Sequence, residues 1–452
     1  MPEYLDPKAT SIQPSIPLQA AHNEVTALSL RANFSWTFVG NVIYAACQWG
    51  MLIALARLGS PEMVGRFALG LAVTAPVFMF TNLQLREIQA TDARTEYAFS
   101  DYLRLRLMTT ALALLIIIAL VLISGYSLAT GLVILGLGLA KACESFSDIF
   151  YGLLQQRERM ERIAKSLIIR GTLSLVMLSI AIAVTGNLLW GIGALVCVWA
   201  GVLVGYDLRS GSLMLHRTPI PQAQAPDKHA RDLPWEPQKL LRLAWLALPL
   251  GAVMMLVSLN SSIPRYFLEH YLDERALGIF AAIAYLQVAG TTVIGALGVS
   301  ALPRLARYYA SGERTNFRRL LLKLITLGTL LGLAGCLVAL LGGREILTVI
   351  YGAAYADHVD LLLWIMLVSL FSYPVSFLGD AITATRHLKV LLVLFVVVVM
   401  VTVIGCLWLI PTLGLVGGAM VLLIAVIVRT VGSVLIVGYA LHRPLATTTT
   451  EE

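Results

Sequence analysis

The phrase EMVGRFA at residues 62–68 has a counterpart in ERALGIFA at residues 274–281. Both contain Gly-x-Phe-Ala, with the glycines at positions 65 and 278. Each phrase stands at the start of a long apolar segment, just after the short connection that ends the preceding one. The equivalent positions of the two phrases predict a chain built from two similar halves.

The composition indicates a membrane protein. Of the 452 residues, 58% are hydrophobic and 13% charged, and a soluble protein carries about twice that charged fraction. The apolar residues form runs of about 20, the length of a helix that crosses a bilayer. We expect an all-α polytopic protein with about 12 transmembrane helices in two six-helix lobes around a central cleft. The expected spans are 34–56, 65–85, 107–126, 129–154, 166–186, 188–208, 243–264, 276–302, 320–342, 359–380, 390–410 and 414–439.

Polar segments set the expected domain boundaries. Because six spans are an even number, both halves enter the membrane from the same side, as in repeats related by an axis along the membrane normal. The start lacks a signal-peptide pattern, so we expect the first span to be retained. The expected parts are a tail (1–33), an N-lobe (34–208), a linker (209–242), a C-lobe (243–440) and a second tail (441–452), with both tails disordered.

The basic residues give the direction of the spans. Alternation over twelve spans puts 25 of the 33 Lys and Arg on one side and only Arg57, Arg66, Arg275 and Arg344 on the other. This bias predicts that both termini are cytoplasmic. The net charge of +7 then belongs to loops that face an anionic leaflet, and no nucleic-acid partner is needed to explain it.

The usual signs of an enzyme are missing from the sequence. It has no Asp-x-Asp pair, no glycine-rich phosphate loop and no Cys or His cluster with metal spacing. The connections on the side with few basic residues are too short for a catalytic domain. We therefore expect a transport protein without a cofactor or a metal, and not an enzyme.

Three charges interrupt the fourth span, in LAKACESFSDIFYGL at residues 139–153. Helical geometry places Glu144 about 60° and Asp148 about 20° from Lys141, so the three share one face. Two compatible readings stay open, because a charge at mid-membrane costs about 2.5–3.5 kcal/mol unless it is paired or hydrated. Either Lys141 pairs with Glu144 and Asp148 with Arg170, or the face lines a water-filled cleft and serves transport.

Two arginines in the second half are further candidates. Arg429 lies near the middle of the last span with no acid within a turn or two, so we expect it to face aqueous space, an anionic ligand or a partner from another helix. Arg265 lies near the end of the seventh span after Asn260, Ser261, Ser262 and Pro264. It could pair with Glu269, reach the interface, or line a hydrated helix end.

The segment GRFALGLAVTAPVFMFTNLQLREIQATDA at residues 65–93, together with the two sets of six spans, resembles one family. It is similar to the O-antigen flippase (Wzx-type) branch of polysaccharide transporters, in the multidrug/oligosaccharidyl-lipid/polysaccharide exporter superfamily. The resemblance implies two lobes around a cationic cavity in the bacterial inner membrane. It also implies that a polyprenyl-diphosphate-linked oligosaccharide, such as a lipopolysaccharide O-antigen unit, is flipped to the outer leaflet by alternating access.

Roles for the candidate residues follow from that resemblance. An arginine donates two hydrogen bonds to a diphosphate at once, so the resemblance makes Arg429 and Arg265, with Arg170 or Lys141, candidates for contact with the headgroup. Glu144 and Asp148 are then candidates for coupling to H⁺ or Na⁺. The implied partners are the lipid-linked oligosaccharide and membrane lipids, with a glycan polymerase or ligase as a further candidate.

Other functions remain open at this stage. A cation-coupled multidrug exporter of the same superfamily usually has an acid in the first span, and residues 34–56 contain none. A major facilitator is disfavoured by the absence of glycine from the loop at residues 86–106. The short loops disfavour a polymerase or ligase, whereas a non-transporting scaffold of a glycan-assembly complex would have charges sealed in its lobes and a dry cleft.

Overall fold

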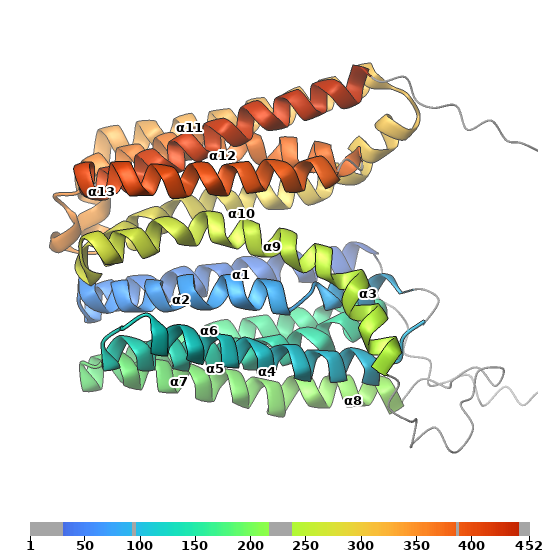
Figure 1. The fold of residues 1–452 in the computed structure, drawn as a ribbon, viewed down its shortest axis with the longest axis horizontal. Coiled ribbons are helices and arrows are strands. Elements are labelled where there is room, and N and C mark those ends of the chain that lie inside the picture. The colour runs from blue at the N-terminus through green and yellow to red at the C-terminus, as the bar shows by residue number, and fades with distance from the viewer. Residues whose placement is uncertain (1–29, 93–95, 217–236, 386–387, 443–452) are drawn as a thin grey trace, which may run out of the picture.

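The computed structural model describes residues 30–92, 96–216, 237–385 and 388–442, and this part of the chain is helical without strands (Figure 1). Eleven of the described helices are long and apolar enough to cross a membrane, so the chain is a multi-pass membrane protein. The helices are α1 (Leu30–Leu58), α2 (Pro61–Thr81), α3 (Leu85–Thr91), α4 (Phe99–Ile123), α5 (Leu128–Gln156), α6 (Met160–Thr185), α7 (Leu188–Val202), α8 (Leu208–His216), α9 (Pro237–Tyr271), α10 (Glu274–Ala310), α11 (Arg314–Ile350), α12 (Val359–Ala384) and α13 (Leu388–His442).

The longest helix, α13, contains two of the predicted spans. Its backbone breaks at Gly414, where φ is +58°. A Cβ on Gly417 would meet Leu409, one on Gly405 would meet Val421, and one on Gly432 would meet Leu394. In each pair the two residue numbers average 413, so residues equally far before and after this position lie side by side. The two arms of α13 therefore form an antiparallel hairpin. With the arms counted separately, the described helices confirm the prediction of about 12 spans in an all-α fold.

Both repeated phrases begin a helix with a side-chain cap. Ser60 accepts a hydrogen bond from the backbone N–H of Met63, with Pro61 in the first turn of α2. Asp273 accepts one from the N–H of Ala276 at the start of α10. Such caps satisfy backbone donors that a helix start leaves open. The repeat therefore specifies where the second and eighth spans begin.

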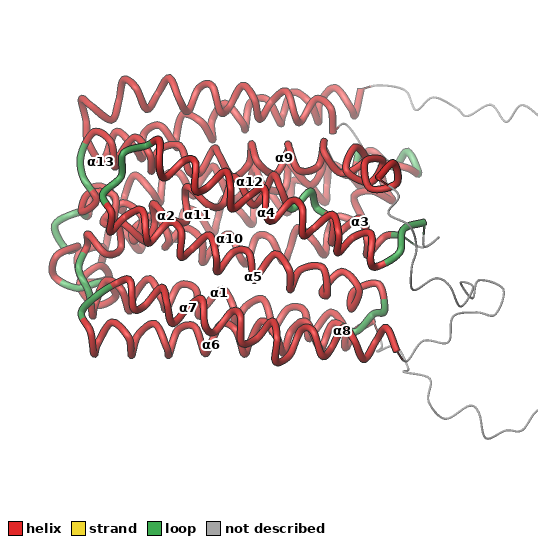
Figure 2. Tube along the Cα trace, turned by 60° about the horizontal axis from the view of Figure 1, so that its bottom comes forward, coloured by secondary structure: helices red, strands yellow, loops and turns green. Residues whose placement is uncertain are grey.

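The helices form two bundles side by side (Figure 1). Helices α1–α8 make the N-lobe, and α10–α13 with most of α9 make the C-lobe. Figure 2 shows the helices running lengthwise, with their connections at the two ends. We call the end that holds the turns at residues 59–60 and 272–273 the distal end, and the opposite end, where Leu30 and His442 lie, the proximal end.

Helix α9 belongs to both lobes. Its first turns bend over the N-lobe at the proximal end (Figure 1), where Lys239 pairs with Asp101 at 3.1 Å. Further along, Thr402 of α13 donates a hydrogen bond to Asn260. Pro249 lies between these two regions, and a proline inside a helix removes a backbone bond and kinks it.

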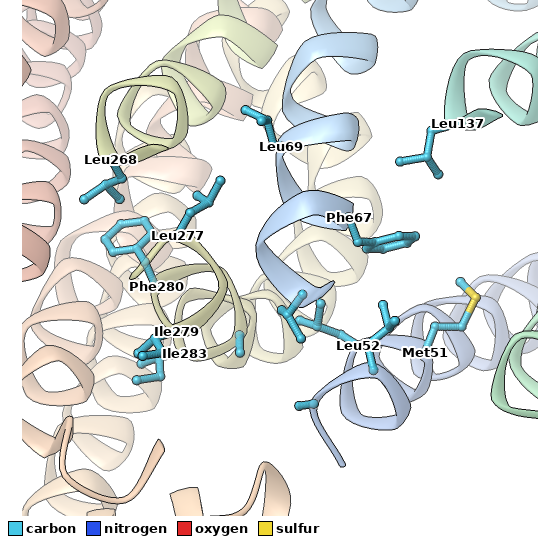
Figure 3. Packing of buried hydrophobic residues seen from close by; sticks show 14 of the residues in the cluster. Met51, Leu52, Phe67, Leu69, Leu137, Leu268, Leu277, Ile279, Phe280 and Ile283 are labelled. Carbon is cyan, nitrogen blue, oxygen red and sulfur yellow. The ribbon is translucent and has the colours of Figure 1, made fainter. Parts of the chain in front are cut away.

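The largest apolar core joins the lobes. It combines residues of α1, α2 and α5 with residues of α9 and α10, among them Phe67, Leu69, Leu268 and Phe280 (Figure 3). Towards the proximal end, a separate core built from Ile294 onward contains C-lobe residues alone. The two lobes are therefore packed together most extensively in the distal part.

The predicted tails and linker are described only in part. Residues 1–29, 217–236 and 443–452 lie outside the described residues, and with them the expected disorder of the tails. At the two ends of the predicted linker, α8 extends to His216 and α9 begins at Pro237.

Candidate functional site

A cavity of about 290 Å³, lined by both apolar and charged or polar side chains, lies between the lobes. The N-lobe contributes side chains from α1, α2, α5 and α7, and the C-lobe contributes side chains from α9 and α10. The lining residues are Tyr44, Gln48, Met51, Phe67, Leu71, Ala75, Leu137, Ala140, Lys141, Glu144, Leu195, Trp199, Ser258, Ser261, Ser262, Arg265 and Tyr285. Three of the six predicted site residues, Lys141, Glu144 and Arg265, thus meet in one cavity.

The two lobes contribute charge to this cavity differently. Lys141 of the N-lobe is paired with Glu144 at 2.7 Å, and its ammonium also lies 5.6 Å from the centre of the Trp199 ring. Arg265 of the C-lobe has phenols as electrostatic neighbours, and no described carboxylate pairs with it. The suggested pair with Glu269 is therefore absent, and the lining keeps one uncompensated positive charge.

Arg170 lies behind the cavity wall and is fully buried. Its guanidinium pairs with Asp207 at 3.1 Å and donates to the Tyr151 hydroxyl. Glu144 is 4.0 Å away from it. The predicted pairing of Arg170 with Asp148 is wrong, because Arg170 pairs with Asp207, an acid inside the predicted sixth span.

Asp207 owes its position to an irregular turn. Residues Leu203–Asp207 form a π-helical segment between α7 and α8. Such a turn adds a residue to the helix and shifts the faces that follow. The carboxylate is fully buried and accepts a hydrogen bond from Ser166 at 2.6 Å.

Asp148 lies in a second cluster, outside the cavity lining. Its carboxylate bridges Arg86 at 3.4 Å and Arg106 at 3.3 Å. Arg106 is fully buried and also donates hydrogen bonds to Asn82 and Ser145. The charges of the fourth span are thus divided: Lys141 and Glu144 reach the cavity, while Asp148 ties α3 and α4 to α5.

Arg429 lies within the C-lobe, apart from the cavity lining. Its guanidinium is 5.2 Å from the centre of the Phe395 ring and 3.6 Å from the place where a Cβ would stand on Gly379. Asp380 of α12 is the described carboxylate that acts on it. The sequence left a partner from another helix open; Asp380, at the end of the predicted tenth span, acts on Arg429 through its charge, but the two form no ion pair within 4.0 Å in the described part of the chain.

The repeated glycines meet above the cavity, at the distal end. A Cβ on Gly65 would stand 1.8 Å from the carbonyl oxygen of Glu274, and one on Gly278 would stand 1.8 Å from that of Pro61. Helices α2 and α10 therefore cross backbone to backbone, in a contact that glycine alone permits. The motif that marks the duplication in the sequence is also the place where the two halves touch.

Polar contacts surround this glycine crossing. Arg66 pairs with Glu274 at 2.6 Å, and Arg275 faces Glu62 at 3.5 Å. Arg57 donates hydrogen bonds to the carbonyl oxygens of Thr348 and Ile350 at the end of α11. All of these contacts join the N-lobe to the C-lobe, so the distal end is closed by several independent links.

An aromatic contact adds to this closure. Trp49 donates a hydrogen bond to the hydroxyl of Tyr351 at 3.1 Å. Burial raises the pKa of Tyr351 to about 12, so the phenol stays neutral at physiological pH. This link therefore does not depend on pH within the physiological range.

Known proteins share both the sequence pattern and the fold. The model of a family described as polysaccharide biosynthesis protein matches residues 30–309. The capsular polysaccharide biosynthesis protein CapF of Staphylococcus aureus is 27% identical over 397 residues, which are 87% of this chain and 95% of CapF.

The structural comparisons concern the fold. The lipid II flippase MurJ in an inward closed conformation has a TM-score of 0.66 at 15% identity, covering 89% of this chain and 86% of MurJ. An inward-facing multidrug resistance transporter of the MATE family has a TM-score of 0.58 at 14% identity, covering 92% and 94%. Both share the two-lobed architecture, and the family match covers more than half of the chain. The chain therefore belongs to the polysaccharide biosynthesis protein family, as its resemblance to polysaccharide transporters predicted.

Proposed function

We propose that this protein flips a polyprenyl-diphosphate-linked oligosaccharide across a bacterial inner membrane by alternating access. Both termini are then cytoplasmic, and the distal end faces outward. The substrate is the repeat unit of a surface polysaccharide, either an O-antigen or, as the CapF relative suggests, a capsule.

One observation carries this proposal: Arg265 of the C-lobe, which has no ion-pair partner among the described residues, shares a cavity with Lys141 of the N-lobe. A diphosphate binds well between two such cations, because a guanidinium donates paired, charge-assisted hydrogen bonds. Tyr44, Tyr285 and three serines in the same lining offer aromatic and hydroxyl surface for sugars. A scaffold with charges sealed in its lobes is disfavoured by this cavity.

The closed distal end supports an alternating mechanism. The glycine crossing and the ion pairs around it join the lobes on the side where the external loops are expected. Release to that side would require these links to separate. Glu144 is the predicted coupling carboxylate that lines the cavity, so the proposal assigns H⁺ or Na⁺ coupling to Glu144 and a structural part to Asp148.

Replacing Arg265 with alanine tests the proposal. Loss of charge-assisted hydrogen bonds worth about 1.5–3 kcal/mol each should reduce transport at least about tenfold, since 1.4 kcal/mol corresponds to a factor of ten. The measurement is surface glycan in a strain that lacks the native protein and is complemented with each variant at equal expression. Arg344→Ala, at an exposed pair with Asp357, is the matched control.

The outcomes separate the proposal from its alternatives. Wild-type glycan with Arg265→Ala would contradict a diphosphate site at this arginine. A loss with Arg429→Ala equal to that with Arg265→Ala would extend the binding surface to α13. If deletion of the protein leaves surface glycan and the lipid-linked precursors unchanged, the flippase assignment fails.

The multidrug alternative rests on Glu144, the acid in the cavity. A cationic drug would bind there, so Glu144→Gln would remove drug resistance while Arg265→Ala would leave or improve it. If the substrate has a diphosphate headgroup, Arg265→Ala is the change that reduces transport. Measuring both variants in the surface-glycan assay and in a drug-resistance assay therefore decides the substrate class.

A further inference from the structure

The charges of the N-lobe form a chain from the cavity into the buried interior. Lys141 pairs with Glu144 at 2.7 Å, Glu144 lies 4.0 Å from Arg170, and Arg170 pairs with Asp207 at 3.1 Å. The first pair lines the cavity, while both Arg170 and Asp207 are fully buried. Each charge thus has one firm partner, and the gap between Glu144 and Arg170 separates the two pairs.

Two hydrogen-bond donors of the Arg170 guanidinium are not used within the described part of the chain. Its Nη2 serves Asp207 and the Tyr151 hydroxyl, but Nε and Nη1 have no hydrogen-bond partner among the described residues. Nη1 is the atom that faces Glu144 at 4.0 Å. A buried donor without a partner is costly, so a small approach of Glu144 would satisfy a group that is otherwise left open.

Glu144 has a different neighbour at each of its two carboxylate oxygens. Tyr44 of α1 donates to one carboxylate oxygen at 3.3 Å, and Lys141 holds the other. Both cations lie near the Trp199 ring, whose centre is 5.6 Å from the Lys141 ammonium and 5.4 Å from the Arg170 guanidinium. Lys141 holds one oxygen of Glu144 while Arg170 faces the other, so the position of the carboxylate sets the strength of both contacts.

We propose that Arg170 and Asp207 act as positioning residues that control how tightly Glu144 holds Lys141. When an anion in the cavity binds Lys141, Glu144 moves to the open donor of Arg170, and the negative charge leaves the headgroup. Asp207 opposes this exchange because it already neutralises Arg170. This inference rests on the proposed function for the identity of the anion, but not for the exchange itself.

Two substitutions should act in opposite directions. Asp207→Asn removes the competing charge, so Arg170 draws Glu144 away and Lys141 is released. Arg170→Lys leaves a single ammonium that pairs with the buried Asp207, so Glu144 stays with Lys141. Ser166→Ala is the matched control, because it removes a hydrogen bond to Asp207 and keeps the carboxylate charge.

The test uses the purified full chain in detergent. Acylation of Lys141 by an N-hydroxysuccinimide ester is measured by mass spectrometry relative to Lys239, which pairs with Asp101. Binding of farnesyl diphosphate is measured in parallel. We expect Asp207→Asn to raise Lys141 acylation and tighten farnesyl diphosphate binding by about fivefold, the lower end of typical couplings between sites. Arg170→Lys should lower both, and Ser166→Ala should change neither.

The readouts separate the possible failures. Unchanged Lys141 acylation in folded Asp207→Asn and Arg170→Lys proteins would overturn the exchange and leave the buried pair purely structural. If Asp207→Asn does not fold, a decrease in acylation with Arg170→Lys supports the exchange and an unchanged rate overturns it. Acylation that shifts as expected without any farnesyl diphosphate binding would uphold the exchange and contradict the diphosphate assignment.

Discussion

Replacing Gly278 with alanine should prevent closure of the distal end and abolish transport. The new Cβ would stand 1.8 Å from the carbonyl oxygen of Pro61, well under the 3.0 Å that real side chains keep. The obstacle is backbone, which cannot rotate away as a side chain can, so α2 and α10 must move apart. Overpacking of this kind costs about 1–3 kcal/mol, and separating the lobes relieves it.

Cysteine labelling in intact cells checks this prediction. Ser262 lines the cavity, and Ser262→Cys, in a chain whose five natural cysteines are replaced, reports external access to a membrane-impermeant thiol reagent. Gly278→Ala should raise its labelling by about tenfold, which corresponds to a shift of about 1.4 kcal/mol. Gly295→Ala is the matched control on the same helix, because its Cβ would meet nothing within 4 Å. Equal labelling in the two variants would show that the crossing does not govern access.

Replacing Asp148 with alanine should prevent stable folding. The change leaves Arg86 and Arg106 without their shared carboxylate, and Arg106 is fully buried. Removing one partner of a buried pair costs about 3–5 kcal/mol, a large part of the stability of a typical domain. The measurement is the amount of membrane-inserted protein and its melting temperature in detergent.

Glu144→Gln provides the contrast on the same helix face. Glu144 lines the cavity, so this variant should accumulate normally and lose transport. An Asp148→Ala protein with normal melting but no transport would instead place Asp148 in the transport path. The pair of variants therefore decides between the two readings of the charged face in the fourth span.

Hydropathy and charge predicted most of the fold, because crossing a bilayer imposes a fixed length on each apolar run. The hairpin in α13 is centred on position 413, between the predicted spans 390–410 and 414–439, and the backbone breaks at Gly414, the first residue of the second of these. The bend of α9 over the N-lobe was not predicted, because a proline shows where a helix can kink and not which lobe its first turns will join.

The site was predicted in part. Placing Lys141, Glu144 and Asp148 on one helix face was sound, but a shared face does not determine which neighbouring helix each side chain meets. Asp148 pairs with Arg86 and Arg106, and Arg170 pairs with Asp207. These partners come from neighbouring helices, and the spacing of residues along one helix does not show which helices pack against it. The π-helical turn that carries Asp207 also has no periodic signature, because it breaks the period on which such arguments rest.

The glycine crossing lies near one end of α10. The helix is about 10 Å long from Gly278 to Tyr285 in the cavity and about 27 Å long from Tyr285 to Pro303, the proline inside it, at about 1.5 Å per residue. If this part of α10 turns as a rigid rod about Tyr285, a separation of about 2 Å at the glycines moves Pro303 by about 5 Å. A single methyl group at Gly278 would then cause a larger displacement at the other end of the rod, which is why the smallest substitution at the contact between the two halves should have a large effect.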